Sequence, residues 1–130
     1  MQSLDHLYVL VVDDNADARD IMKLGLEHEG AMVHAAPNAP EGILMLSTVL
    51  PDVIVTDMTM PPMDGYEFLA HLKSSPLWRH IPVIAVTGFG LIHEERNARA
   101  AGFADYLLKP VAPPELAAAI VRVITRLKAR

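Results

Sequence analysis

The chain has 130 residues, a formal net charge of −5 at pH 7 and no cysteine. A chain of this length suits one domain with one core, and its acidic balance argues against a nucleic-acid-binding domain. The lack of cysteine excludes disulfides and zinc–thiolate sites, and no apolar stretch of ~20 residues or signal-peptide pattern is present, so we expect a single cytoplasmic domain over residues 1–130 without membrane contact.

Apolar runs of strand length alternate five times with helical patterns along the chain. In chain order the pattern predicts strand Tyr8–Val12, helix Asp17–Glu29, strand Met32–Ala35, a helix from Asn38 to Pro51, strand Val53–Thr56, a helix that follows Asp64, strand Val83–Val86, helix Ile92–Ala101, strand Phe103–Leu107 and a helix from Pro113 to the end.

Cap-like residues mark several of the predicted helix ends. Asn38 and Asp64 are each followed three residues later by a glutamate, a spacing typical of helix starts. Gly30 is placed to end the first helix. The predicted apolar sides are Ile21, Met22, Leu24 and Leu26 in the first helix, Ile43, Leu44, Leu46 and Leu50 in the second, and Phe68, Leu69 and Leu72 in the third.

The first, third and fourth predicted strands are continuously apolar, as expected of strands that helices cover on both faces. Strands that alternate with helices form a parallel sheet with right-handed crossovers, so the fold class we expect is α/β. In an open sheet of this kind, ligands bind beyond the carboxyl ends of the strands, where the strand order reverses.

Four of the apolar runs end in reactive polar residues. Asp13 and Asp14 follow the first strand, Asp57 the third, Thr87 the fourth and Lys109 the fifth. If the strands are parallel, three carboxylates, a hydroxyl and an ammonium converge at the carboxyl edge of one sheet. Each residue alone has a plainer interpretation, as a helix cap, a turn residue or a surface lysine. The combination favours a functional site.

Three carboxylates close together repel one another by roughly 1–4 kcal/mol per pair at ~4 Å, so the cluster takes up protons or binds a cation. The all-oxygen set of Asp13, Asp14 and Asp57 suits Mg²⁺. An aspartate carboxylate such as Asp57 can be the nucleophile that forms an aspartyl-phosphate. Thr87 and Lys109 fit the role of holding phosphoryl oxygens, because phosphoryl transfer depends mainly on positioning and charge neutralisation.

These motifs resemble those of response-regulator receiver domains, the phospho-accepting half of two-component signalling. The resemblance covers essentially the whole chain, and its motifs are Val-Val-Asp13-Asp14, Asp57 followed by Met60-Pro61-x-Met63-Asp64-Gly65, Ile-Ala-Val-Thr87-Gly88 and Tyr106-Leu-Leu-Lys109-Pro110. The resemblance implies a flavodoxin-like, doubly wound, five-stranded parallel sheet with strand order 2-1-3-4-5 and five helices. It also implies a self-catalysed phosphoacceptor rather than a conventional enzyme.

The family's residue roles follow from the same resemblance. Asp57 would accept phosphate from a histidine kinase or phosphotransfer protein, and Asp14, Asp57 and the Thr59 carbonyl would bind Mg²⁺, with Asp13 acting through a water. Thr87 and Tyr106 would form the switch that controls a downstream protein target. The Lys109–Pro110 bond is expected to be cis.

The chain departs from the family pattern near the site. Ala112 stands where the family often has a capping Ser or Asp, so the last helix start depends on Pro113-Pro114. Gly88 replaces the commoner alanine, and the bulky Phe89 is a candidate shield for the phosphoryl group.

The last helix has a predicted core stripe and additional apolar residues beside it, which are Leu116, Ile120, Val123, Ile124 and Leu127, and then Ala117, Ala118 and Val121. A broadly buried helix explains this pattern. A sharper hypothesis is a homodimer or partner surface formed by the fourth helix, the fifth strand and the fifth helix.

Other functions stay open at this stage. One is a protein-interaction module that is never phosphorylated. Another is an aspartate-nucleophile phosphohydrolase, although Thr59 occupies the place of the second acid that this class needs. A flavin-binding electron carrier is disfavoured because Asp13 and Asp14 would repel the flavin phosphate.

Overall fold

The computed structural model describes residues 3–88 and 94–129. Strands and helices alternate strictly, as the sequence predicts, and their bounds are β1 Tyr8–Val12, α1 Ala16–His28, β2 Met32–Ala36, α2 Ala39–Met45, β3 Val53–Asp57, α3 Gly65–Lys73, β4 Val83–Thr87, α4 Glu94–Ala101, β5 Asp105–Leu108 and α5 Pro113–Lys128. The expected start of the fourth helix at Ile92 lies outside the described residues.

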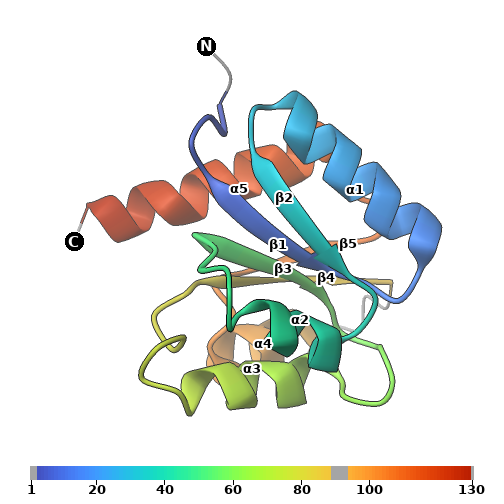
Figure 1. The fold of residues 1–130 in the computed structure, drawn as a ribbon, viewed down its shortest axis with the longest axis vertical. Coiled ribbons are helices and arrows are strands. Elements are labelled where there is room, and N and C mark those ends of the chain that lie inside the picture. Colours follow the sequence, from blue (N-terminus) through green and yellow to red (C-terminus); the bar gives the residue numbers. More distant parts are fainter. Residues whose placement is uncertain (1–2, 89–93, 130) are drawn as a thin grey trace.

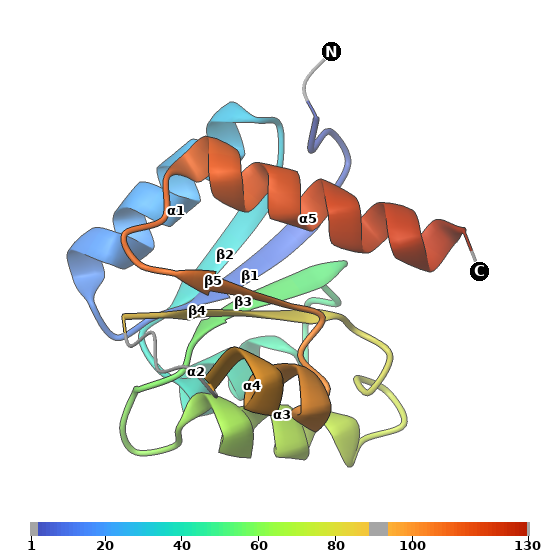
Figure 2. The ribbon, with the colours of Figure 1, turned by 180° about the vertical axis from the view of Figure 1, so that it is seen from behind.

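The five strands form one parallel sheet in the order β2-β1-β3-β4-β5. This confirms the doubly wound, flavodoxin-like topology. Helices α1 and α5 lie on one face of the sheet, and α2, α3 and α4 lie on the other (Figure 1). The same three layers are seen from behind in Figure 2, where α5 crosses the strands on the side of α1.

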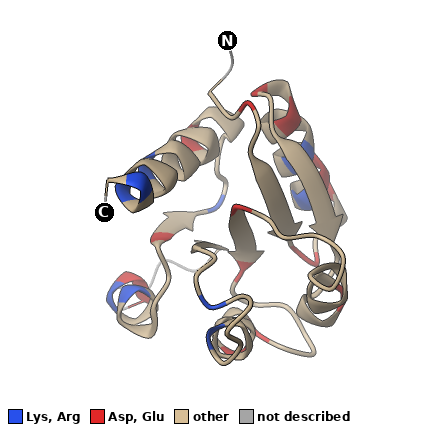
Figure 3. Cartoon of the chain, turned by 60° about the vertical axis from the view of Figure 1, so that its left-hand side comes forward, with Lys and Arg blue, Asp and Glu red and all other residues tan. Residues whose placement is uncertain are grey.

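The sheet is buried between two apolar cores, one on each face. The core under α1 and α5 contains Met22, Leu26, Leu116 and Ile120 with inward residues of β1, β3 and β4. The core on the other face joins α2, α3 and α4, and Phe68 is its largest fully buried side chain. The strands are almost free of charged residues (Figure 3). Charge within the sheet is therefore confined to Asp57 and Asp105, at a strand end and a strand start.

The helix ends follow local chemistry. Asn15 caps α1 through a bond from the Ala18 N–H, so neither Asp13 nor Asp14 is the cap. Asn38 caps α2, and Asp64 forms a reciprocal capping box with Glu67 at the start of α3. These two helix starts are confirmed.

Two glycines sit where the chain leaves a helix. Gly30 and Gly102 have φ angles of 101° and 116°, which residues with a Cβ adopt only with strain. The predicted end of the first helix at Gly30 is confirmed, since α1 stops two residues earlier.

Part of the predicted apolar pattern is wrong. Ile21 and Leu24 of α1 are 56% and 67% exposed, because α1 packs on the sheet through Met22 and Leu26, which lie one helical turn apart. Leu44 and Leu50 are exposed as well, at 66% and 65%.

The second helix is also shorter than predicted. It ends at Met45 rather than running to Pro51. The Ser47 and Thr48 hydroxyls donate to the carbonyl oxygens of Leu44 and Met45, which closes the helix with side-chain bonds.

Helix α5 begins without a side-chain cap at Ala112, as expected from the sequence. Its first three turns bury Leu116, Ile120 and Val123, whereas Leu127 is 40% exposed, so the predicted stripe does not extend to the end of the helix. Because α5 follows β5 and runs back across the sheet, its last turn lies at the amino edge of the strands, where Lys128 and Asp5 line one groove with residues at the starts of β3 and β4. Figure 1 marks the two ends of the chain.

Helices α1 and α5 approach each other closely at Gly25. A Cβ atom built on Gly25 would lie 2.3 Å from the Cβ of Pro113. The glycine thus permits the first turn of α5 to lie against α1. Within the described residues, no helix combines the length and apolarity needed to cross a membrane.

Candidate functional site

The polar strand ends predicted from the sequence lie at the carboxyl edge of the sheet. Asp57 is the last residue of β3 and Thr87 the last residue of β4, while Asp13 follows β1 and Lys109 follows β5. In a parallel sheet these positions share one edge, so four chain segments far apart in sequence supply one site.

The acidic residues at this edge form a cluster. Carboxylate oxygens of Asp13, Asp14 and Asp57 all lie within 4.8 Å of one another. Asp13 is fully buried and Asp57 is 7% exposed, whereas Asp14 is exposed to solvent. A cation could therefore reach the cluster from the Asp14 side.

Lys109 faces two of these acids. Its Nζ lies 2.7 Å from Asp13 Oδ2 and 3.6 Å from Asp57 Oδ2. Burial alone lowers the pKa of the Lys109 ammonium, but the contact with Asp13 and the charge of Asp57 outweigh it, so the pKa lies above its ordinary value. The ammonium stays protonated at neutral pH. The Lys109 N–H also donates to the Thr87 carbonyl at 2.8 Å, which ties the end of β5 to the end of β4.

Burial makes the ionised form of the Asp57 carboxyl unfavourable, so the pKa of this group is raised. Burial raises its pKa, the Lys109 ammonium lowers it, Asp13 raises it again, and the N–H groups of Thr59 and Met58 lower it. The net pKa lies above the ordinary value of 3.8. The Thr59 N–H lies 3.4 Å from Asp57 Oδ1, so Thr59 adjoins the acidic cluster through its backbone. A bound cation would stabilise the ionised carboxylate in this buried position.

Thr87 is 1% exposed at the end of β4. In the register of β3 and β4, Asp57 stands opposite Val86, so Thr87 lies one residue beyond Asp57 along the sheet. Gly88 follows directly, and among the residues that the structure describes no atom would lie within 4 Å of a Cβ added there. This open space beside Thr87 leaves room for a small anion. Phe89, which the sequence suggests as a shield, lies outside the described residues.

Tyr106 on β5 is buried at 8% exposure and belongs to the core on the α4 side of the sheet. Burial, together with the negative charge of Glu94, the neighbouring Tyr66 and Glu95, raises the pKa of the Tyr106 hydroxyl. Its ring is thus turned inward, beside the start of α4. The Lys109–Pro110 bond is cis, as expected.

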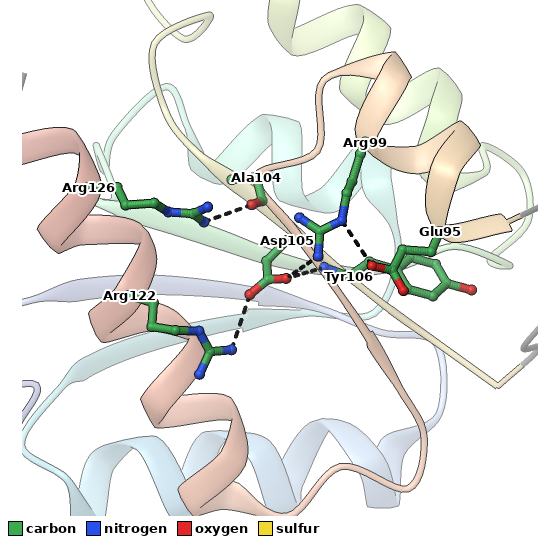
Figure 4. Close-up of polar contacts among 7 residues, drawn as sticks. All are labelled: Glu95, Arg99, Ala104, Asp105, Tyr106, Arg122 and Arg126. Carbon is green, nitrogen blue, oxygen red and sulfur yellow. Dashed lines mark hydrogen bonds and ion pairs between the residues drawn. The ribbon is translucent and has the colours of Figure 1, made fainter.

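The sequence prediction missed a polar cluster next to Tyr106. Asp105 accepts bonds from Arg99 of α4 at 2.9 Å and from Arg122 of α5 at 3.3 Å (Figure 4). Asp105 also accepts the Tyr106 N–H at 2.9 Å, and Arg126 donates to the Ala104 carbonyl. One carboxylate therefore joins α4, β5 and α5.

The cluster explains the acidity of Asp105. Burial raises the pKa of the Asp105 carboxyl, but the Tyr106 N–H and the two arginines outweigh burial, so the pKa lies below 3.8. A charged residue inside a strand pattern, directly before a candidate switch residue, was the sequence signal that could have revealed this cluster.

The donor set at the acidic edge fits Mg²⁺. It consists only of oxygen atoms, it includes one solvent-exposed carboxylate, and it retains negative charge after the Lys109 contact. A hard cation of this kind binds through one or two carboxylates and keeps several waters. The arrangement also places an ammonium and a buried hydroxyl residue near the Asp57 carboxylate, and groups of these types can carry out phosphoryl transfer.

Comparison with known proteins points in the same direction. A family model described as the response regulator receiver domain matches residues 9–121. A protein described as an uncharacterized 14.6 kDa protein in the sodA1 3′ region of Leptolyngbya boryana is 43% identical over 116 residues, which span 89% of this chain and 88% of that protein. The phosphate regulon transcriptional regulatory protein PhoB of Escherichia coli is 33% identical over 92% of this chain. This chain spans 52% of PhoB, about half of its length.

Solved structures of response regulators have the same fold as this chain. The chemotaxis response regulator CheY4 of Vibrio cholerae superposes with a TM-score of 0.83 at 27% identity, covering 90% of this chain and 98% of that one. A response regulator receiver domain protein from Clostridium thermocellum superposes with a TM-score of 0.84 at 33% identity, covering 95% and 98%.

Proposed function

This chain belongs to the response regulator receiver domain family, and we propose on that premise that it is a phosphorylation-operated signalling switch with Asp57 as its phosphoacceptor. The donor would be the phosphohistidine of a histidine kinase or of a phosphotransfer protein. The observation that carries the proposal is the gathering of three carboxylates at one sheet edge, with the Lys109 ammonium against two of them.

The transfer step needs a nucleophile and a fixed geometry. An oxygen of the Asp57 carboxylate attacks the phosphorus, a P–O bond forms while the donor P–N bond breaks, and the electron pair leaves with the donor imidazole. Asp14, Asp57 and the Thr59 carbonyl would hold Mg²⁺ directly and Asp13 would hold it through a water. When bound, the ion supplies positive charge that neutralises the phosphoryl oxygens.

Lys109 and Thr87 complete the phosphoryl site. The raised pKa of Lys109 keeps a proton on its nitrogen, so the ammonium can pair with a phosphoryl oxygen while it still touches Asp13. The Thr87 hydroxyl would donate to another oxygen, with the open space at Gly88 beside it. The residue types at these positions support this division of roles.

Phosphorylation would act by shifting a population. As Thr87 moves toward the phosphate, the inward position of Tyr106 is favoured, and the surface of α4, β5 and α5 changes for a downstream protein. Moving a switch from mostly off to mostly on takes roughly 5.5 kcal/mol of differential binding, which a few charge-assisted contacts to phosphate can supply. The protein turns over no substrate beyond its own aspartyl-phosphate.

The decisive experiment is incubation with acetyl phosphate and Mg²⁺, followed by intact-mass measurement. We expect an adduct of about 80 Da on the wild type and none on Asp57→Asn. Asp20→Asn, which changes an exposed aspartate on α1, is the matched control and should gain the adduct. An adduct on Asp57→Asn, or none on the wild type, contradicts the proposal.

A further inference from the structure

We propose that Arg19 is a positioning residue that aims the Asp14 carboxylate at the cation position. Its guanidinium would do so by fixing the peptide group between Asp13 and Asp14. This inference rests on the proposed function, because it needs a cation to bind at the acidic cluster.

The contact is a hydrogen bond from side chain to backbone. Arg19 lies in the first turns of α1, and its Nη1 donates to the Asp13 carbonyl oxygen at 2.9 Å in a partly buried position. The Arg19 N–H donates to the Asn15 carbonyl at 2.9 Å, and Asn15 is the cap of the helix. The guanidinium therefore reaches back from a capped, well-defined helix to the loop that precedes it.

The other polar groups of Asp13 are already held. Its N–H donates to Ala36 of β2 at 3.1 Å, its Oδ1 accepts the Asn15 N–H at 2.9 Å, and its Oδ2 is ion-paired with Lys109 at 2.7 Å. The bond from Arg19 adds the carbonyl oxygen to this set. Asp13 is then fixed at both ends of its backbone and at both carboxylate oxygens.

The carbonyl of Asp13 belongs to the same planar peptide group as the N–H of Asp14. Fixing the carbonyl direction fixes this plane and leaves rotation at Asp14 itself as the main freedom. Asp14 needs such help, because within the described part of the chain no hydrogen bond or ion pair holds its exposed carboxylate. Its carboxylate nevertheless reaches the common 4.8 Å cluster with Asp13 and Asp57.

Charge and geometry make opposite predictions here. A guanidinium near a cation site repels the cation, so by Coulomb's law alone its removal should tighten Mg²⁺ binding. If Arg19 positions a ligand instead, its removal should weaken binding. Losing a residue that orients a metal ligand typically lowers metal affinity 10- to 100-fold. The sign of the change therefore separates the two cases.

The test is calorimetric titration of Mg²⁺ into wild type, Arg19→Met and Arg19→Lys. Methionine keeps the apolar stem without a donor, and lysine keeps a donor and the charge. We expect roughly tenfold weaker Mg²⁺ binding for Arg19→Met and an intermediate affinity for Arg19→Lys. Lys23→Met is the matched control, because it removes a charge from the same helix at an exposed ion pair with Glu27, and it should stay within about twofold of the wild type.

A second measurement separates positioning from general damage. The rate of phosphorylation by acetyl phosphate should fall for Arg19→Met at low Mg²⁺ and recover at saturating Mg²⁺, because a poorly aimed ligand is compensated by ion concentration. A defect that persists at saturation overturns the inference, as does Mg²⁺ binding to Arg19→Met that equals or exceeds that of the wild type. A wild type that binds no Mg²⁺ would instead overturn the proposed function, and this inference with it.

Discussion

Asp57 lies in a place that is unfavourable for the folded protein by itself. Its carboxylate is buried beside Asp13, and the pKa of its carboxyl is raised first by burial. The folded protein therefore binds this proton more tightly than the unfolded chain. The resulting stabilisation is present at low pH and is lost as pH rises from 3.8 through the raised folded pKa, so ionised Asp57 destabilises the fold at neutral pH.

We predict that Asp57→Asn, without Mg²⁺, raises the free energy of unfolding at pH 7 by on the order of 1 kcal/mol, because a neutral amide costs less to bury than the ionised carboxylate and is not repelled by Asp13. Urea denaturation of both proteins measures this difference. The gain should vanish below pH 3.8, where Asp57 of the wild type is protonated as well. Equal or lower stability of the variant at pH 7 would show that the Lys109 contact already compensates the charge.

At the scale of elements, the sequence was most informative where the local chemistry decides the structure. The alternation of runs gave the element order, and Asn38 and Asp64 marked two helix starts because their caps need only neighbouring residues. Ile21 and Leu24 were misassigned because the buried face of α1 is set by the sheet it packs on.

Some residues of the candidate site could likewise be predicted from the sequence, and others could not. Asp13, Asp14, Asp57, Thr87 and Lys109 could be found because strand ends share one edge of a parallel sheet. The Arg19 bond to a backbone carbonyl left no sequence pattern. The charged Asp105 within a strand pattern was a signal for a polar cluster, but its partners Arg99 and Arg122 could not be predicted, since they depend on how elements pack.

Asp105 joins α4, β5 and α5, so its removal should loosen their packing. Its pKa is lowered in the fold, so the stabilisation is present above 3.8 and is lost as pH falls through the folded value. We predict that Asp105→Asn lowers the free energy of unfolding by about 1–2 kcal/mol at pH 7, and by less at pH 3.

Urea denaturation at the two pH values provides the measurement. Glu95→Gln is the control, since it removes the more exposed ion pair with Arg99 and should cost at most about 0.5 kcal/mol. An Asp105→Asn effect no larger than that of Glu95→Gln would contradict a joining role for Asp105.

The contact of α1 with α5 depends on a missing side chain. At Gly25 a new methyl group would overlap Pro113, whereas at Gly88 it would meet no atom of residues 3–88 and 94–129 within 4 Å. We predict that Gly25→Ala lowers the free energy of unfolding by about 1–3 kcal/mol despite the better helix propensity of alanine, and that Gly88→Ala changes it by less than about 0.5 kcal/mol. Thermal unfolding of the two variants measures the difference. Similar midpoint temperatures for Gly25→Ala and Gly88→Ala would mean that α1 and α5 can move apart to admit a methyl group at no cost, which contradicts the prediction.

At the scale of the whole molecule, the candidate site and the proposed output surface lie on different parts of one fold. Val121 of α5 is 36% exposed and lines a groove together with Arg99, Asp105 and Arg122, the last three of which are drawn in Figure 4. Apolar side chains rimmed by charged groups are typical of surfaces that bind other proteins. A homodimer through α4, β5 and α5 therefore remains a prediction, and this surface is where we expect the contact.

We predict that acetyl phosphate with Mg²⁺ shifts the protein from monomer toward dimer in sedimentation velocity, and that Val121→Asp abolishes the shift without preventing phosphorylation of Asp57. A protein that sediments as a monomer under both conditions rules the dimer out. A dimer that Val121→Asp leaves intact would place the contact elsewhere.

The course of the chain also has a practical consequence. The segment ahead of β1 and the last turn of α5 lie at the amino edge of the sheet, while the acidic cluster lies at the carboxyl edge. Five-residue strands separate the two edges by about 16 Å. A fluorescent label, a surface anchor or a fused protein attached after α5 would thus leave the opposite end of the molecule open to a donor as large as another protein. Immobilised samples should therefore exchange phosphate as freely as dissolved ones.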